Sequence, residues 1–176
     1  MPIVKTKRKD ILRKKEIETL LKKASPEMQC LIAFLWAFGK RISEVLALNR
    51  EDVFVANEFL HVRFQVLKKR KKGERYLKRL TLNHPATRHI LSYVETMHEG
   101  SLFPSMTRQL AWYYLKKLSK QIYPHLFRKS LATEMSERSY TVQQLMSWFD
   151  WSEPKVAMEY VSRGPGLTKE LSERTW

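Results

Sequence analysis

The sequence has little cysteine and no long apolar run, and both shortages narrow the classes of protein that it can encode. Cys30 is the only cysteine, so an internal disulfide is excluded, and no Cys/His cluster has zinc spacing. Because Cys30 lies inside the apolar run Cys30–Phe38, we expect a buried, unreactive thiol. That run is far shorter than the ~20 residues that span a bilayer. The basic N-terminus also lacks the apolar core of a signal peptide, so we predict neither a membrane segment nor secretion.

Negative charge is also scarce. The 33 Lys and Arg residues outnumber 18 Asp and Glu residues, which gives a formal net charge of +15. Such an excess suits a nucleic-acid partner, because each phosphate that a protein neutralises releases counterions. A ribosomal-type RNA-binding protein or a solubilising surface would also be basic. The charge therefore favours nucleic-acid binding and leaves catalysis open.

The spacing of apolar residues predicts an α+β fold class, namely a mainly α-helical domain with one small antiparallel β-sheet. Ser25 and Pro26 are typical of a helix start, and Gly39 interrupts the same helix. Residues 59–67 and 76–82 alternate like strands, and the polar segment Lys68–Arg75 between them predicts a basic hairpin tip. Helical spacing covers residues 11–23, 26–38, 42–48, 85–98, 107–121, 127–138, 141–148 and 153–161. We expect a basic arm (1–10), one folded domain (11–163) and a tail (164–176).

The first candidate for chemistry lies at the turn after the apolar helix. Gly39 turns the chain, so Arg41 projects from the beginning of the next helix. A guanidinium at such a corner can hold a phosphate with two hydrogen bonds, and Glu44, one turn on, can orient it. The alternative is an ordinary surface Arg–Glu pair.

Two further segments add candidates near the C-terminus. His125 and Arg128, just after Pro124, share a helical face and can grip one phosphate, although a surface His with a backbone-contacting Arg would share the same spacing. Trp151 lies just before the last predicted helix (153–161), and Tyr160 lies near the end of that helix. Taken singly, both aromatic residues would be assigned to packing.

Together these segments resemble one family, the tyrosine recombinases of phage integrase and chromosome-resolution type. Gly39–Leu48 resembles the first-arginine box of the family, and His125–Arg128 resembles its His-x-x-Arg box. Leu102–Phe103 is similar to the Leu-Phe segment that precedes the penultimate helices, and Trp151 precedes Tyr160 at the family's spacing. The matches follow the family order from about residue 10 to residue 165. Three positions depart from the residues that are common in the family. Phe127 replaces leucine, Lys129 replaces histidine, and Asp150 replaces glycine.

The resemblance implies a catalytic domain that cleaves and rejoins DNA through a 3′-phosphotyrosine bond. Tyr160 would be the nucleophile, Arg41 and Arg128 would neutralise the phosphate, and a hairpin lysine would protonate the leaving 5′ oxygen. The resemblance assigns this lysine to Lys69. Lys68 remains an alternative, because a one-residue slip of register points a different side chain inward. His125 would assist proton transfer or hold the phosphate, and Trp151 can donate only its indole N–H. The implied catalytic set is Arg41, Lys69, His125, Arg128, Trp151 and Tyr160, with Glu44 behind Arg41.

The resemblance also implies partners. We expect double-stranded DNA and further recombinase protomers assembled on it, with no membrane, small-molecule substrate, metal or cofactor, since the phosphotyrosine ester conserves the phosphodiester's energy. The tail would pack on a neighbouring protomer, and the location would be DNA-associated, in the cytoplasm of a prokaryotic or viral host cell. A non-catalytic DNA-binding regulator and a topoisomerase-like enzyme remain alternatives. The residues expected to contact DNA are Lys40, Lys68, Arg70, Lys71, Lys72 and Arg75.

Overall fold

A computed structural model of the chain describes residues 11–67 and 73–161. Eight α-helices and three strands lie in these ranges, so the expectation of a mainly helical α+β domain with one small antiparallel sheet is confirmed. No helix in this part of the chain is long and apolar enough to cross a bilayer. The elements are α1 (Lys14–Lys23), α2 (Pro26–Phe38), α3 (Ile42–Leu46), a 3-10 turn (Arg50–Asp52), β1 (Val53–Ala56), β2 (Phe59–Gln65), β3 (Arg75–Thr81), α4 (Pro85–Val94), α5 (Arg108–Leu118), α6 (Pro124–Glu137), α7 (Val142–Phe149) and α8 (Pro154–Val161).

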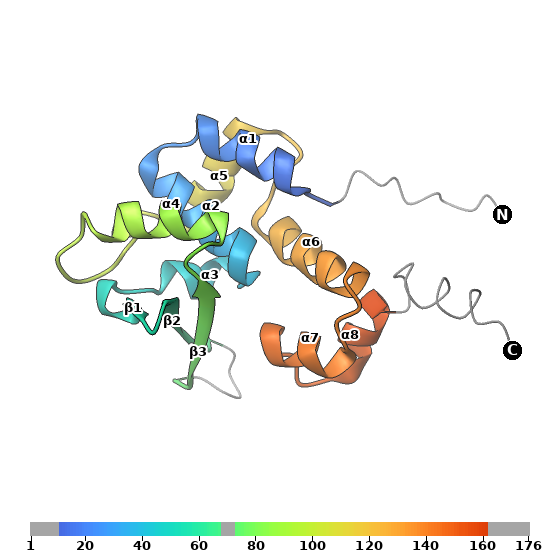
Figure 1. Cartoon of the computed structure of the whole chain (residues 1–176). Coiled ribbons are helices and arrows are strands. Elements are labelled where there is room, and N and C mark those ends of the chain that lie inside the picture. The colour runs from blue at the N-terminus through green and yellow to red at the C-terminus, as the bar shows by residue number, and fades with distance from the viewer. Residues whose placement is uncertain (1–10, 68–72, 162–176) are drawn as a thin grey trace, which may run out of the picture.

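Helix α2 forms the centre of the molecule. Ser25 caps its N-terminus by accepting a hydrogen bond from the backbone N–H of Met28, and Pro26 occupies the first turn, as predicted. Nearly every later residue of α2 is buried, Cys30 included at 0% exposure. Helices α1, α4 and α6 and the short α3 pack around α2 (Figure 1). A helix that is apolar on all sides must be covered on all sides, and this arrangement follows from that requirement.

The sheet has the order β1-β2-β3 with antiparallel neighbours. Its register pairs Val53 with Val62 and Leu60 with Leu80. Alternate residues of β2 (Leu60, Val62 and Phe64) are buried, so one face of this strand packs on the core. Phe64 on β2 meets Phe38 of α2 with ring centroids 5.2 Å apart. Strands β2 and β3 are antiparallel neighbours, which agrees with the predicted hairpin. Residues 68–72 of the hairpin tip lie outside the described residues.

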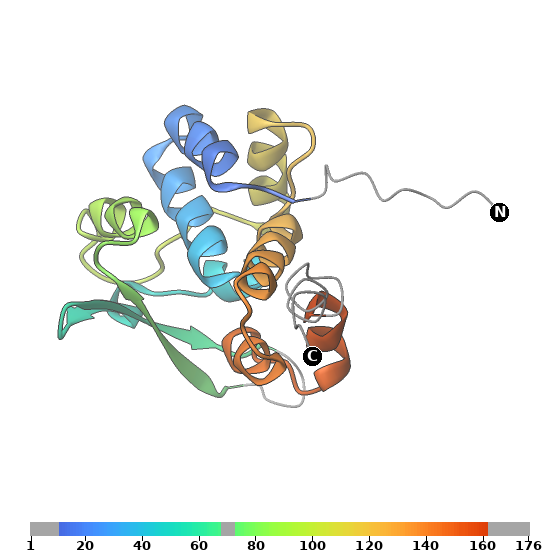
Figure 2. The same cartoon turned by 45° about the vertical axis from the view of Figure 1, so that its right-hand side comes forward.

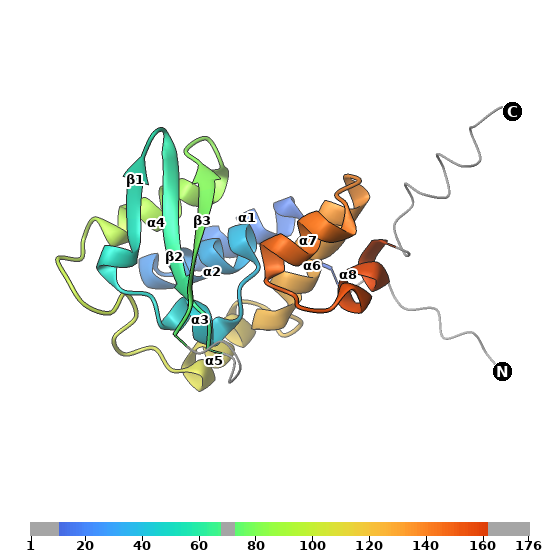
Figure 3. The same cartoon turned by 90° about the horizontal axis from the view of Figure 1, so that it is seen from below.

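The C-terminal helices form a second, smaller core. Ala132 of α6, Leu145 and Phe149 of α7, and Ala157 of α8 are buried together. Helix α6 contacts both α2 and α8, so it joins the two cores (Figures 1 and 2). Seen from below, the sheet lies at one end of the molecule and α7 and α8 lie at the other (Figure 3). The expected arm (1–10) and tail (164–176) lie outside the described ranges.

Several predicted helix boundaries were wrong by three or four residues. The helix expected over residues 11–23 begins at Lys14, and the one expected over residues 107–121 ends at Leu118. The helix expected to begin at Phe127 begins at Pro124, because proline suits the first turn of a helix. The helix expected to reach His98 ends at Val94. Met97 still packs on the core from the following turn, which explains why its apolar character imitated a longer helix.

Candidate functional site

Two left-handed turns meet where the large core adjoins the small one. Gly39 ends α2 with φ 58°, and Asp150 ends α7 with φ 54°. The turns are in close contact, since a Cβ on Gly39 would lie 2.6 Å from Cε1 of Phe149. Glycine is therefore required at position 39 for two reasons, the backbone conformation and the space. Asp150 adopts the same conformation with a side chain, which only a few residue types tolerate.

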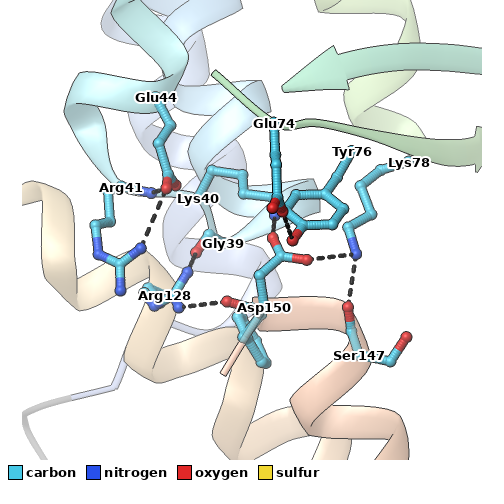
Figure 4. Close-up of polar contacts among 11 residues, drawn as sticks. Gly39, Lys40, Arg41, Glu44, Glu74, Tyr76, Lys78, Arg128, Ser147 and Asp150 are labelled. Atoms are coloured by element: carbon cyan, nitrogen blue, oxygen red, sulfur yellow. Dashed lines mark hydrogen bonds and ion pairs between the residues drawn. The ribbon is translucent and has the colours of Figure 1, made fainter. Parts of the chain in front are cut away.

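Arg128 joins the two turns. Its Nη1 donates a hydrogen bond to the carbonyl oxygen of Gly39 (2.7 Å), and its Nη2 donates to that of Phe149 (2.8 Å) (Figure 4). The residue is 3% exposed, and its guanidinium lies 5.5 Å from the ring centroid of Trp151. Burial, and then the positive charge of Arg41, lower the pKa of Arg128 to about 10, which still leaves it charged at neutral pH. Two of its five N–H donors are occupied by these carbonyls.

Arg41 lies directly after the Gly39 turn, at the N-cap position of α3. Glu44 is 5% exposed and accepts from the Arg41 backbone N–H (3.0 Å) and from its Nη1 (3.1 Å), so the expected Arg–Glu contact is present (Figure 4). The Arg41 side chain is 32% exposed. It is therefore held at its base by a buried carboxylate while part of its guanidinium faces solvent.

His125 and Arg41 line the same cleft of about 1000 Å³. His125 is in the first turn of α6 and is exposed at the rim, although the cleft walls partly desolvate its ring. Partial burial, then the charges of Arg128 and Arg41, lower the pKa of His125. The neutral imidazole is thus favoured at neutral pH, in which form it can accept a proton.

Trp151 and Tyr160 complete the group. Their rings stack with centroids 5.5 Å apart and an interplanar angle of 10°, and Trp151 stacks in turn on Phe149 at 4.7 Å. The charge of the Tyr160 phenol influences the pKa of Arg128, so these two groups are within electrostatic reach. Ser136 donates to the backbone carbonyl of Tyr160 (2.8 Å), which fixes this part of α8 against α6.

The structure therefore brings five of the six expected catalytic residues into one region. Arg128 is the hub: it contacts the ring of Trp151, and its charge interacts with those of Arg41, His125 and Tyr160. The sixth, Lys69, and the expected DNA contacts Lys68, Arg70, Lys71 and Lys72 lie outside the described residues. Arg75 is 54% exposed and pairs with Asp52 (3.3 Å), at the sheet end from which the hairpin leaves.

Lys40 does not fit the DNA-contacting role expected for it. Its side chain is 2% exposed, and its ammonium is paired with the carboxylate of Asp150 (Figure 4). The ammonium also lies 5.3 Å from the ring centroid of Phe64. Because Lys40 follows a turn that points inward, its charge is compensated inside the protein and is not presented to a phosphate.

One set of residues beside the cleft was missed by the sequence analysis. Helix α5 contributes polar and aromatic side chains to the cleft that Arg41 also lines, with Trp112 51% exposed. The signal was available, because this tryptophan has basic residues one turn before and one turn after it on the same helical face. The α5 residues that line the cleft are Arg108, Gln109, Trp112 and Lys116.

Metal ligands are not grouped in the described ranges: no three His, Cys, Asp or Glu side chains there are placed to hold an ion. The polar groups that converge in this region are instead guanidinium, imidazole, indole and phenol. These groups can bind and neutralise an oxyanion, accept a proton and supply an oxygen nucleophile.

The phage integrase family model matches residues 10–164 of the chain. Among curated proteins, tyrosine recombinase XerC of Chlamydia trachomatis serovar L2 is 27% identical over 158 residues, covering 84% of this chain and 50% of the relative. Tyrosine recombinase XerC of serovar D of the same species gives the same values. The chain thus spans about half the length of the curated relatives it matches.

Two solved structures have the same fold. The XerH site-specific recombinase bound to palindromic difH substrate, in a post-cleavage complex, has a TM-score of 0.74 at 14% identity and covers 92% of this chain and 52% of that chain. The catalytic domain of bacteriophage HP1 integrase has a TM-score of 0.67 at 15% identity, covering 93% of this chain and 94% of that chain. The second match is nearly complete on both sides, so the two chains share one fold over almost their whole lengths.

Proposed function

The chain belongs to the phage integrase family, and from that membership we propose that it cleaves and rejoins DNA strands through a covalent bond to Tyr160. The observation that carries the proposal is the position of Arg128. It is buried beside Trp151, within electrostatic reach of Tyr160, His125 and Arg41, while its Nη atoms bridge two helix ends. Bridging the helix ends is a structural role, so the support for catalysis comes from the other groups gathered around Arg128.

The reaction is a transesterification at phosphorus. The Tyr160 oxygen forms a bond to the scissile phosphorus, and the bond from phosphorus to the 5′ oxygen breaks. The product is a 3′-phosphotyrosyl ester with a free 5′ hydroxyl. Reversal, with a 5′ hydroxyl from the same or another strand, restores a phosphodiester, so the bond energy is conserved in the ester.

Each group has a task that follows from its chemistry. A phenol with a pKa of ~10 is a weak nucleophile at neutral pH, so it needs a proton acceptor, and neutral His125 is suited to that role. Arg41 and Arg128 would neutralise the charge that grows on the non-bridging oxygens in the transition state. Trp151 would donate its indole N–H to one of those oxygens and pack Tyr160 in place.

Loss of the 5′ oxygen requires a proton, and we propose that Lys69 supplies it, with Lys68 as the alternative. Both lysines belong to the segment between β2 and β3. General acid help of this kind is typically worth ~10²–10⁴ in rate.

The test uses a duplex library with random sequence around one bridging 5′-phosphorothiolate. Cleavage releases a 5′ thiol that rejoins poorly, so the covalent adduct accumulates and can be isolated on a denaturing gel and sequenced. We expect wild type and Tyr140→Phe, a control on an exposed tyrosine, to form the adduct and Tyr160→Phe to form none. If the wild type forms no adduct with any member of the library, a non-catalytic DNA-binding protein is favoured.

The same chemistry identifies the lysine. A thiol with a pKa near ~8.5 leaves without a proton donor, whereas an alkoxide does not. Replacing the acid should therefore slow cleavage of the normal diester by ~10²–10⁴ and leave the phosphorothiolate nearly unaffected. We expect this pattern for Lys69→Ala and not for Lys68→Ala; the reverse assigns the role to Lys68.

We propose double-stranded DNA as the substrate, with further protomers assembled on it, and the cytoplasm of a prokaryotic or viral host cell as the location. The net charge of +15 and the bacterial relatives support these assignments. Joining of the trapped strand to a second duplex would distinguish a recombinase from a topoisomerase-like enzyme.

We also propose that residues 164–176 pack on a neighbouring protomer. Light scattering tests this, since deleting the tail should then reduce the mass of any oligomer.

A further inference from the structure

The charged residues beside Arg128 form a network that the proposed chemistry does not use. Asp150 binds Lys40 through Oδ2 and Lys78 through Oδ1, the second contact being 3.1 Å (Figure 4). Lys78 also donates to the carbonyl oxygen of Ser147 at 2.6 Å. The side chains of Lys40, Asp150 and Lys78 are 2%, 18% and 11% exposed, so the network is largely excluded from water.

The network connects three separate parts of the chain. Lys40 belongs to the turn between α2 and α3, Lys78 to strand β3, and Asp150 to the turn between α7 and α8. Asp150 and Lys40 are the immediate neighbours of Phe149 and Gly39, whose carbonyls Arg128 bridges. The two turns are therefore cross-linked twice in succession, once by Arg128 and once by the Lys40–Asp150 pair.

The flanking residues show what this second cross-link controls. Lys40 directly precedes Arg41, and Asp150 directly precedes Trp151. A shift of the Asp150 turn would move the Phe149 carbonyl away from Arg128 and the Trp151 ring away from Tyr160. Asp150 also holds a left-handed conformation that an ordinary side chain disfavours, and two bound ammonium groups offset that cost. Burial lowers the pKa of Lys40, and Asp150 opposes this, so the pair keeps the buried ammonium charged.

We propose that Asp150 is a positioning residue for DNA cleavage, holding the turn that bears Trp151 in register with the turn that bears Arg41 through Lys40 and Lys78. The inference rests on the proposed function. Its characteristic consequence is redundancy, because either lysine alone still tethers the carboxylate. Removing both lysines leaves the Asp150 carboxylate without either ion pair, and its exposed part is then hydrated by solvent.

The test compares Lys40→Met, Lys78→Met and the double variant. We expect each single variant to keep the single-turnover cleavage rate at saturating DNA within about threefold of wild type, and the double variant to lose ~10-fold or more. The matched control is Lys22→Met/Lys23→Met on α1, which removes the same charge from an exposed surface. All rates are measured where circular dichroism shows the variants fully folded, and DNA affinity is measured separately.

A second readout does not require activity. The indole N–H resonance of Trp151, assigned with Trp151→Phe, should shift or broaden in the double variant, while that of Trp36, buried in the main core, should not. Asp150→Asn should reproduce both effects of the double variant. The proposal is overturned if the double variant and Asp150→Asn keep the wild-type rate and the Trp151 resonance. It is also overturned if the Trp36 resonance moves equally, since the network would then only stabilise the fold. If the wild type cleaves no DNA but the Trp151 resonance is displaced in the double variant, the proposed function is refuted and the positioning role of Asp150 is not.

Discussion

Replacing Gly39 by alanine tests the close contact between the turns at Gly39 and Phe149. The substitution has two separable costs. A side chain in the left-handed conformation costs ~1–2 kcal/mol, and Gly39 has φ 58°. The new Cβ would also lie 2.6 Å from Cε1 of Phe149 and 3.1 Å from Cδ2 of Leu131. Phe149 is only 1% exposed, so its ring has no free space into which to move. Overpacking of this kind typically costs ~1–3 kcal/mol.

We therefore expect Gly39→Ala to lower the free energy of unfolding by about 2–5 kcal/mol, the sum of the two costs. Gly100→Ala is the matched control, because Gly100 has φ 80° and a Cβ added there would meet nothing within 4 Å. It should lose only the backbone part, ~1–2 kcal/mol. Urea unfolding with a common slope measures both. Equal destabilisation of the two variants would refute the argument that the turns at Gly39 and Phe149 are in contact.

Other groups of the site give further expectations. Arg41→Ala should abolish cleavage yet cost only ~1 kcal/mol of stability, because its ion pair is partly exposed. Arg128→Ala should abolish cleavage and also cost ~2–5 kcal/mol, because two helix-end carbonyls lose their donor; equal melting temperatures for the two variants would contradict this contrast. The cleavage rate should fall on acidification with an inflection below 6.5, since the pKa of His125 is lowered and only neutral imidazole accepts a proton; a rate that rises instead would assign His125 to phosphate binding. Cys30 should resist an aromatic disulfide reagent in the folded protein, because it is 0% exposed and burial raises its pKa, whereas rapid labelling would show that α2 opens.

Local signals were enough to predict the centre of the fold. Ser25, Pro26 and Gly39 fix the ends of α2 through capping, a proline-compatible first turn and a left-handed stop, none of which depends on distant residues. The alternation of residues in β2 and β3 also predicted these strands, because one face of each strand is more buried than the other.

The arrangement around Arg128 could not be predicted in this way. Motif spacing identified Arg41, His125, Arg128, Trp151 and Tyr160, but nothing near Arg128 in the sequence indicates that its guanidinium binds two main-chain carbonyls. The Lys40–Asp150 pair joins residues separated by 110 positions. Lys40 was expected to contact DNA, and nothing next to it in the sequence indicates that its side chain is buried against Asp150.

The two carbonyls that Arg128 holds belong to the C-terminal ends of α2 and α7. Each helix end carries a partial negative charge of roughly half a unit from its macrodipole. Arg128 therefore neutralises two helix dipoles at once, which explains how a guanidinium can be buried without bonding a carboxylate. A phosphate arriving at Arg128 would share the guanidinium with both helix ends, so its binding would depend on the alignment of one helix from each core.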